Sequence, residues 1–253
     1  DYVYPRTTNK ILRAYLKSKG VKDTDIDEKY TPFGHSDYQT IVADIKKFAA
    51  GGKTAVVSTI NGDANVPFYK ELGNQKISAE DIPVVAFSVG EEELSGIDTK
   101  PLVGHLAAWN YFESVKSPAN SEFIKAWKTY IKNDKRTTND PMEATYIGFN
   151  LWVKAVEKAK TTDTAKVIDA LPGLEVPNLT GGTAKMLANH HITKPVYIGE
   201  IKEDGQFETV WQTKGTVPGD AWSDFLDGSK DLESDWVALK CGNYNTKLKK
   251  CSN

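Results

Sequence analysis

The sequence predicts an α/β protein in which helices alternate with the strands of a mainly parallel sheet. Residues 54–60 and 83–88 are short apolar runs rich in β-branched side chains, which is typical of strands buried on both faces. Segments with apolar residues at helical spacing separate these runs, and this alternation is the sequence signature of βαβ units. The 253 residues are 40% hydrophobic and 26% charged, a composition typical of a globular protein that can bury a core.

The first 109 residues are expected to switch repeatedly between helix and strand. In chain order we expect a helix over 7–19, a strand over 29–32, a helix from Ser36 or Asp37 to Gly51, a strand over 54–60, a helix over 65–72, a strand over 83–88, a helical turn over 91–94 and a strand over 102–109. Tyr2 and Tyr4 precede the first helix on alternate positions of an extended segment. Both rings should therefore project to the same side.

The middle of the chain is predicted to be helical over 120–132, 141–158 and 164–171. A loop follows Gly173, and two strands between residues 195 and 211 flank Asp204-Gly205, a strong hairpin signal. A polar, aromatic tail begins near Gly215. The middle has few strands for three helices, and the chain opens on a helix with no strand before it. We therefore expect the missing strands to come from residues outside this chain.

Charge and motifs exclude several classes of protein. The 32 basic and 34 acidic side chains nearly cancel and form no basic block, so a nucleic acid partner is not expected. No run of about 18 apolar residues is present that could span a bilayer. The sequence has no nucleophile elbow, phosphate loop or dinucleotide fingerprint, and it predicts no cofactor. The adjacent His190 and His191 lack a partner at metal-ligand spacing, so no metal site is expected.

The two cysteines, Cys241 and Cys251, close a short loop in the tail. Their spacing fits a local disulfide, with two free thiols as the alternative. A paired tail in an otherwise cysteine-free chain suits an oxidising compartment outside the cytoplasm.

Polar side chains follow the predicted strands at the edge where an α/β sheet binds ligands. Asn61 and Asp63 come after the 54–60 strand in an Asn-Gly-Asp sequence that is also an ordinary turn. Glu91 comes after the 83–88 strand within three adjacent glutamates, which either form a solvated helix start or place one carboxylate in a cleft. Trp109 either packs at a hinge or forms a cleft wall.

Seven ordered strings give the chain a family resemblance. They are DYVYPR (1–6), YTPFGHSD (30–37), STINGDAN (58–65), FSVGEEE (87–93), GHLAAWNYF (104–112), NDPMEA (139–144) and NHHITKP (189–195). Together they closely resemble the urea-binding subgroup of ABC transporter substrate-binding proteins, within the type I periplasmic binding proteins that include amide and branched-chain amino acid binders. The resemblance extends to about residue 231 and leaves out the tail.

The resemblance implies two α/β lobes joined by three crossover segments, with the ligand held between them. Residues 1–104 and 194–253 would form the second lobe, and residues 105–193 the remaining part of an incomplete first lobe. About a third of a usual chain would be missing before Asp1.

The resemblance also implies the ligand contacts. Tyr2 and Tyr4 match an aromatic pair that contacts the ligand, whereas Asn61, Asp63 and Trp109 resemble cleft-edge positions. Ser88, Gly90 and Glu91 match a cleft-facing loop whose glutamate holds an amino group in amino acid binders, with the register between Glu91 and Glu92 left open.

The function that follows is a periplasmic protein that captures urea or a short amide and delivers it to ABC transporter permease subunits, without catalysis. Whether a lipid anchors it through a missing amino terminus is left open. An amide or branched-chain amino acid sensor of the same fold is the alternative. A small-amide hydrolase using Glu91 or Asp63 with His105 is disfavoured, because no nucleophile stands near a base.

Overall fold

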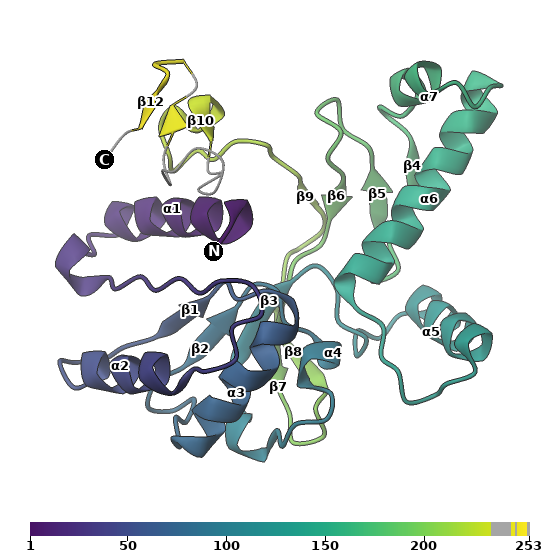
Figure 1. Cartoon of the computed structure of the whole chain (residues 1–253). Helices are drawn as coiled ribbons and strands as arrows, with labels where there is room; N and C mark the ends of the chain where they lie inside the picture. Colours follow the sequence, from purple (N-terminus) through teal and green to yellow (C-terminus); the bar gives the residue numbers. More distant parts are fainter. Residues whose placement is uncertain (234–243, 246, 252–253) are drawn as a thin grey trace.

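The computed structural model describes residues 1–233, 244–245 and 247–251 of the chain. Its α-helices, labelled in Figure 1, are α1 (Val3–Ser18), α2 (Gln39–Ala49), α3 (Asn65–Asn74), α4 (Glu91–Leu94), α5 (Pro118–Ile131), α6 (Asp140–Ala159) and α7 (Thr164–Ala170). Its strands are β1 (Val56–Ser58), β2 (Val84–Ala86), β3 (Leu106–Trp109), β4 (Glu175–Pro177), β5 (Thr183–Lys185), β6 (Thr193–Lys194), β7 (Tyr197–Ile201), β8 (Phe207–Gln212), β9 (Val217–Pro218), β10 (Leu232–Glu233), β11 (Tyr244–Asn245) and β12 (Lys250–Cys251). Within these ranges no helix is both long and apolar enough to cross a membrane.

The main sheet has five strands in the order β1-β2-β3-β7-β8. β1, β2 and β3 are parallel to one another, which confirms the predicted βαβ alternation. β7 pairs antiparallel with β3 and with β8, so the sheet is mixed. β7 and β8 form the predicted hairpin, with Gly205 at a φ of 77° in the turn.

The described residues form three hydrophobic clusters, of which the smallest packs α6 against α7 through Ala155 and Val167. The largest one packs α2 and α3 against the main sheet, through residues such as Val42, Leu72 and Val84. The second one packs α6 against the β4–β5 hairpin, through Ile147 and Val176. The predicted boundary after residue 104 falls just before β3, a central strand of the main sheet, so the chain leaves that sheet only after Trp109.

The amino-terminal prediction was wrong in one respect. Tyr2 and Tyr4 do not lie on an extended segment, because α1 already begins at Val3 and the Arg6 amide donates to the Tyr2 carbonyl. Pro5 does not interrupt this start, since the first amides of a helix have no intrahelical partner. Tyr2 is therefore the residue that caps the helix, and Tyr4 lies in its first turn.

The predicted strands of the first 109 residues are shorter than expected or absent. The runs over 54–60 and 83–88 form strands only over Val56–Ser58 and Val84–Ala86. Residues 29–32 belong to no strand. Of the predicted strand over 102–109 only β3 remains, because the chain first makes a 3₁₀ turn over Lys100–Leu102. The three predicted helices of the middle are confirmed as α5, α6 and α7, and each begins at a side chain that caps it: Ser117, Asn139 and Asp163.

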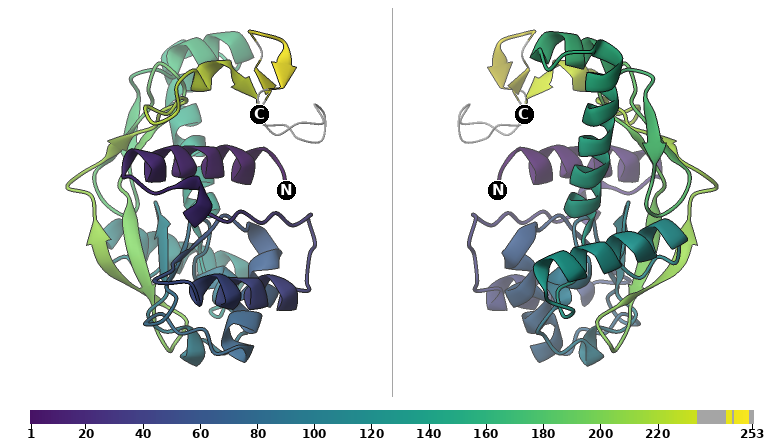
Figure 2. Two further views of the ribbon diagram at one scale, coloured as in Figure 1. Left: turned by 90° about the vertical axis from the view of Figure 1, so that its left-hand side faces the viewer. Right: turned by 90° about the vertical axis from the view of Figure 1, so that its right-hand side faces the viewer.

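Helix α1 lies over the β1 edge of the sheet, between the sheet and the carboxyl-terminal strands (Figures 1 and 2). Tyr15 touches the tail, with its ring centroid 5.1 Å from that of Phe225. Pro5 is the only buried residue of the helix. The apolar side of α1 is therefore less completely packed than those of α2 and α3.

Gly199 of β7 allows two aromatic rings to stack against the sheet. The rings of Phe112 and Phe207 stack with centroids 4.6 Å apart, and a Cβ at Gly199 would lie 2.9 Å from Phe207 and 3.0 Å from Phe112. Gly199→Ala should therefore lower the free energy of unfolding by about 1–3 kcal/mol through overpacking. Guanidinium chloride unfolding, followed by far-UV circular dichroism, measures this change.

Gly148→Ala is the matched control for that measurement. Gly148 lies exposed inside α6, and a Cβ there would meet no atom within 4 Å. Alanine at this position should stabilise the protein by about 0.5–1 kcal/mol, because glycine is a poorer helix former. Equal effects of the two substitutions would contradict the packing role of Gly199.

Candidate functional site

The start of α1 lies across the carboxyl ends of two neighbouring strands. The amide nitrogen of Asn61, just beyond β1, donates to the hydroxyl of Tyr2 at 2.7 Å. The hydroxyl of Tyr4 donates to the carbonyl of Phe87, just beyond β2, at 3.5 Å. Burial raises the pKa of Tyr4, so this phenol stays protonated at neutral pH.

A cavity of about 270 Å³ opens at this edge. It is lined by Asp1, Tyr2, Pro5, residues 29–34 and residues 59–64. Asn61 and Asp63 are exposed there, and the rings of Tyr2 and Phe33 lie 4.7 Å apart. The cavity therefore offers amide, carboxylate and phenol oxygens beside aromatic surface, which suits a small planar ligand with N–H groups.

Two buried polar side chains hold the two strand ends together. Asn65 donates its amide hydrogens to the carbonyls of Ile60 at 3.0 Å and Gly62 at 3.2 Å. The hydroxyl of Ser88 donates to the carbonyl of Ile60 at 3.0 Å. Ser88 thus supports the loop that carries Asn61 and Asp63. Sequence reasoning missed Asn65, although an asparagine two residues after Asn-Gly-Asp is a signal for such a loop bond.

The side chain of Glu91 does not line the cavity and points instead toward the segment that follows β3. It is 2% exposed, and its Oε1 accepts the amide hydrogen of Ser114 at 3.0 Å. Burial raises the pKa of this carboxyl group. Its Oε2 is buried without a partner among the described residues. In this structure Glu91 therefore ties α4 to the segment that follows β3, and its role in ligand binding stays a prediction.

Gly90 and Trp109 lie on the same side of the molecule as Glu91 and do not line the cavity. A Cβ at Gly90 would lie 3.4 Å from the indole ring of Trp109, so the ring packs directly on the glycine backbone. The neighbouring Glu92 pairs with Arg136 at 3.0 Å and accepts the hydroxyl hydrogen of Thr137 at 2.7 Å. The eight candidate residues thus form two groups. Tyr2, Asn61 and Asp63 line the cavity, with Tyr4 and Ser88 bonded to the strand ends beside it, whereas Gly90, Glu91 and Trp109 lie at the crossover.

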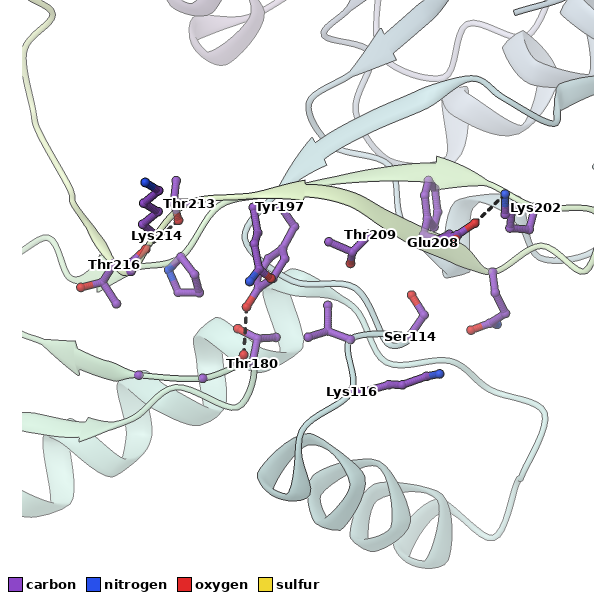
Figure 3. Close-up of a pocket in the computed structure, with 18 of the residues that line it drawn as sticks. Ser114, Lys116, Thr180, Tyr197, Lys202, Glu208, Thr209, Thr213, Lys214 and Thr216 are labelled. Carbon is purple, nitrogen blue, oxygen red and sulfur yellow. Dashed lines mark hydrogen bonds and ion pairs between the residues drawn. The ribbon is translucent and has the colours of Figure 1, made fainter.

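A larger groove of about 880 Å³ lies between the β7–β8 hairpin and the crossover loops (Figure 3). Its lining is rich in hydroxyl and lysine side chains, among them Lys116 and Lys202. The hydroxyl of Tyr197 donates to the carbonyl of Thr180 at 2.8 Å, and Lys202 pairs with Glu208 at 2.7 Å. The sequence contained no motif that signalled this groove.

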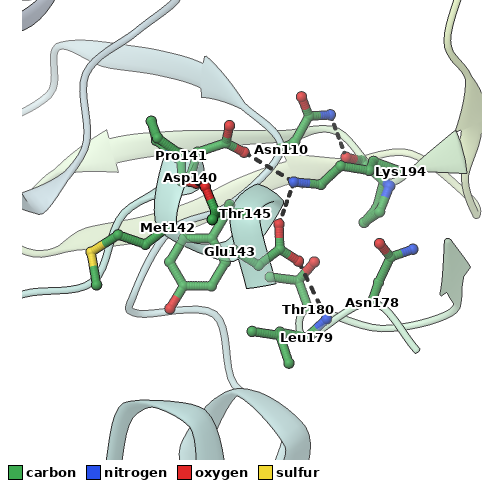
Figure 4. Close-up of polar contacts among 12 residues, drawn as sticks. Asn110, Asp140, Pro141, Met142, Glu143, Thr145, Asn178, Leu179, Thr180 and Lys194 are labelled. Carbon is green, nitrogen blue, oxygen red and sulfur yellow. Dashed lines mark hydrogen bonds and ion pairs between the residues drawn. The ribbon is translucent and has the colours of Figure 1, made fainter. Parts of the chain in front are cut away.

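A buried ionic cluster joins the crossover segments (Figure 4). Lys194 of β6 contacts two carboxylates at the start of α6, Asp140 at 3.2 Å and Glu143. Glu143 also accepts the amide hydrogen of Leu179 at 3.3 Å. Burial raises the pKa values of Asp140 and Glu143, and the charge of Lys194 opposes that rise. The cluster fixes β6 to α6 where the chain returns toward the main sheet.

The geometry does not support the hydrolase alternative. His105 is fully buried, and its Nδ1 accepts the amide hydrogen of Val84 at 3.1 Å. Its Nε2 then carries the proton and donates to the carbonyl of Ile77 at 3.2 Å. Both nitrogens are therefore occupied by the backbone, and neither reaches Glu91 or Asp63.

Two further expectations concern metals and the tail. In residues 1–233, 244–245 and 247–251 no group of three or more His, Cys, Asp or Glu side chains is arranged to hold a metal ion. The predicted disulfide involves Cys241, which lies outside the described residues.

Comparison with curated proteins gives partial matches. The chain is 25% identical over 181 residues to "Leu/Ile/Val-binding protein homolog 6" of Brucella melitensis, covering 70% of this chain and 45% of that protein. It is 29% identical over 120 residues to "Limonene hydroxylase" of Geobacillus stearothermophilus, covering 47% of this chain and 22% of that protein. The chain therefore spans less than half the length of these relatives.

Solved structures share the fold. A solute-binding protein of an ABC transporter from Rhodopseudomonas palustris, in complex with p-hydroxybenzoic acid, superposes with a TM-score of 0.68 at 22% identity, covering 81% of this chain and 56% of that one. An amino acid ABC transporter substrate-binding protein from Pseudomonas fluorescens gives a TM-score of 0.67 at 18% identity, covering 84% of this chain and 55% of that one. The predicted type I periplasmic binding protein fold is confirmed.

The family model for the periplasmic binding protein domain matches residues 1–228, which is most of the chain. The match includes the main sheet, the helical middle and the cavity at the carboxyl ends of β1 and β2. The chain belongs to the periplasmic binding protein domain family.

Proposed function

We propose that this chain is part of an exported solute-binding protein that captures urea or a short-chain amide between two lobes and delivers it to an ABC transporter permease. The observation that carries the proposal is the cavity beside Tyr2, Asn61 and Asp63. It lies where an α/β sheet presents its strand ends to ligands. The protein performs no catalysis.

The chemistry of the cavity suits urea. Urea is planar and neutral, with four N–H hydrogens and one carbonyl oxygen, so its site must supply several acceptors and at least one donor. The carboxylate of Asp63 and the oxygens of Asn61 and Tyr2 are acceptors, while the Asn61 amide is a donor. Such a ligand buries little apolar area, so its affinity depends on complete hydrogen bonding inside a cleft that closes.

The relatives support the transport role but not the choice of ligand. Their names describe binding of leucine, isoleucine and valine, or of an aromatic acid. A branched-chain amino acid or amide binder of the same fold is therefore the second candidate. An amino acid would need a cation for its carboxylate. Lys29, which lines the cavity, is already paired with Asp27 at 3.3 Å and with Asp44 at 3.5 Å, and Arg6 in the first turns of α1 is paired with Asp1 at 2.7 Å.

Isothermal titration distinguishes these ligands. Urea, acetamide, leucine and p-hydroxybenzoate are each titrated into this chain and into a longer form that includes the polypeptide before Asp1. We expect urea to bind the longer form well and this chain weakly or not at all, because half a cleft cannot enclose the ligand. Heat from leucine or p-hydroxybenzoate alone would remove the urea assignment, and no heat from any ligand would remove the binding role.

Asp63→Asn tests the acceptor in the cavity. It replaces a charged acceptor of N–H groups by a neutral amide, and it should weaken urea binding by the longer form about tenfold. Glu80→Gln is the control, because Glu80 is exposed on the turn before β2, at the opposite end of the sheet. If both variants bind urea equally well, Asp63 does not contact the ligand.

A further inference from the structure

The cavity at the carboxyl ends of β1 and β2 contains a carboxylate that has no cation beside it. Asp63 lines the cavity and is exposed, and its oxygens make no hydrogen bond or ion pair with any residue that the structure describes. Burial, together with the charges of Glu92 and Asp63, raises the pKa of the nearby Glu93 carboxyl group. The negative charge of Asp63 therefore lies beside further carboxyl groups and is not compensated.

The other charged groups of the cavity wall already have partners. Lys29 is paired with two carboxylates, at 3.3 and 3.5 Å. The ammonium group of Asp1 donates to the carbonyl of Thr31, and the Asp1 carboxylate is paired with Arg6 at 2.7 Å. Asp63 is thus the charged side chain of this wall that a ligand can still neutralise, and a cation is the ligand that it favours.

The edge of the cavity already holds one planar cation. The guanidinium group of Arg6 donates to both carboxylate oxygens of Asp1, at 2.7 and 3.1 Å. Its central carbon lies 3.6 Å from the centroid of the Tyr30 ring, and Tyr30 lines the cavity. A carboxylate in the plane of the cation and an aromatic ring over its face are the two features that recognise guanidinium groups in proteins.

The cavity offers the same two features a second time, without a cation between them. Asp63 supplies the carboxylate, and the rings of Tyr2 and Phe33, 4.7 Å apart, supply the aromatic surface. Phe33 is 72% exposed, so its ring is available to a ligand. The Asn61 amide already donates to the Tyr2 hydroxyl at 2.7 Å, which leaves the Asn61 oxygen as an acceptor. These groups favour a planar ligand that has N–H groups on every side.

We propose that this cavity takes small amidine and guanidine cations and binds them more tightly than the neutral amides of the same shape. Asp63 accepts two parallel N–H groups of the cation, and the rings of Tyr2 and Phe33 lie against its plane. The inference rests on the proposed function, because it uses the same cavity, and it extends the ligand class from neutral amides to planar nitrogen cations.

Two pairs of ligands of equal shape separate the effect of charge. Guanidinium is compared with urea, and acetamidinium with acetamide, by nuclear magnetic resonance of the backbone amides of residues 61–64 in the whole chain. The ligands are used at up to about 50 mM, far below the concentrations that unfold proteins. Each cation should bind at least about fivefold more tightly than its neutral counterpart, because hydrogen bonds between charged groups are stronger. Raising potassium chloride from about 20 to about 300 mM should weaken binding of the cations only.

Asp63→Asn keeps the shape of the side chain and removes its charge. It should weaken binding of the cations about fivefold more than binding of the neutral ligands, so that the two members of each pair bind equally well. Phe33→Leu should weaken binding of the cations about threefold, because it removes the ring and keeps an apolar side chain. Glu80→Gln, which is exposed at the opposite end of the sheet, is the control and should leave every affinity unchanged.

The possible results separate this inference from the proposed function. If urea and acetamide bind at the cavity at least as tightly as the cations, the inference is wrong and the urea assignment stands. Preferential binding of the cations that persists in Asp63→Asn would also overturn the inference, because the charge of Asp63 would not be its source. If the cations alone bind, the inference holds and the urea assignment fails. If none of the four ligands shifts the resonances of residues 61–64, both are wrong.

Discussion

Lys194→Met is expected to lower the free energy of unfolding by about 3–5 kcal/mol, because it leaves buried carboxylates without their cation. Glu143 is fully buried and Asp140 mostly so, and Lys194 contacts both. Methionine keeps the volume of the side chain and removes only its charge. The measurement is thermal unfolding at pH 7, because the denaturants urea and guanidinium are both proposed ligands.

The pH dependence of this loss has a defined sign. Burial raises the pKa values of Asp140 and Glu143, and without Lys194 these values should rise further. An acid whose pKa is higher in the folded than in the unfolded protein destabilises the fold as the pH rises through its folded value. The deficit of Lys194→Met should therefore shrink as the pH falls from 7 toward about 5.

A triple variant separates the charge effect from packing. Asp140→Asn, Glu143→Gln and Lys194→Met together remove every charge of the cluster at nearly constant volume. The triple variant should recover most of the lost stability, since neutralising a buried ion pair costs far less than breaking it. A triple variant as unstable as the single one would show that Lys194 acts through packing instead.

The sequence predicted elements whose signals are local. The β-branched run over 54–60 became β1, the run over 83–88 became β2, and Asp204-Gly205 formed the β7–β8 turn. Helix starts were predicted to within about two residues in the middle of the chain, where a capping side chain accompanies an apolar stripe. In each case the residues that decide the structure are neighbours in the sequence.

The prediction of a strand over residues 29–32 was wrong, because a strand depends on residues outside its own segment. A strand exists through hydrogen bonds to a partner strand, and no described strand pairs with this segment. Its composition favours an extended backbone, and Ile26 just before it is extended.

The candidate site was predicted only in part because its geometry depends on distant residues. Position after a strand was enough to select Asn61 and Asp63, which do line the cavity. Position after a strand does not set the direction of the Glu91 carboxylate, which accepts the Ser114 amide hydrogen from 23 residues away, and its role in ligand binding stays a prediction. The pairing of Lys194 with Asp140 spans 54 residues, and no local pattern signals it.

Asn120→Ala should be nearly as damaging as Lys194→Met, with a loss of about 3 kcal/mol. Asn120 is buried at the start of α5, where its amide hydrogens go to the carbonyls of Glu113 at 3.0 Å and Val115 at 2.8 Å. Its Oδ1 accepts the hydroxyl hydrogen of Tyr111 at 2.7 Å. Alanine removes three hydrogen bonds, each worth about 1 kcal/mol, and leaves their partners buried.

A double-mutant cycle with Tyr111→Phe tests whether this loss belongs to one network. The Tyr111 hydroxyl also lies 2.6 Å from Oγ1 of Thr138, so Asn120, Tyr111 and Thr138 together brace the segment that links β3 to α5. The double variant should be about 1 kcal/mol more stable than the sum of the single losses predicts, because both substitutions remove the same bond. Asn150→Ala on α6 is the control, since the Asn150 amide bonds only to the Tyr146 carbonyl one turn earlier. Strict additivity, or an equal loss in Asn150→Ala, would show that the network does not hold the crossover in place.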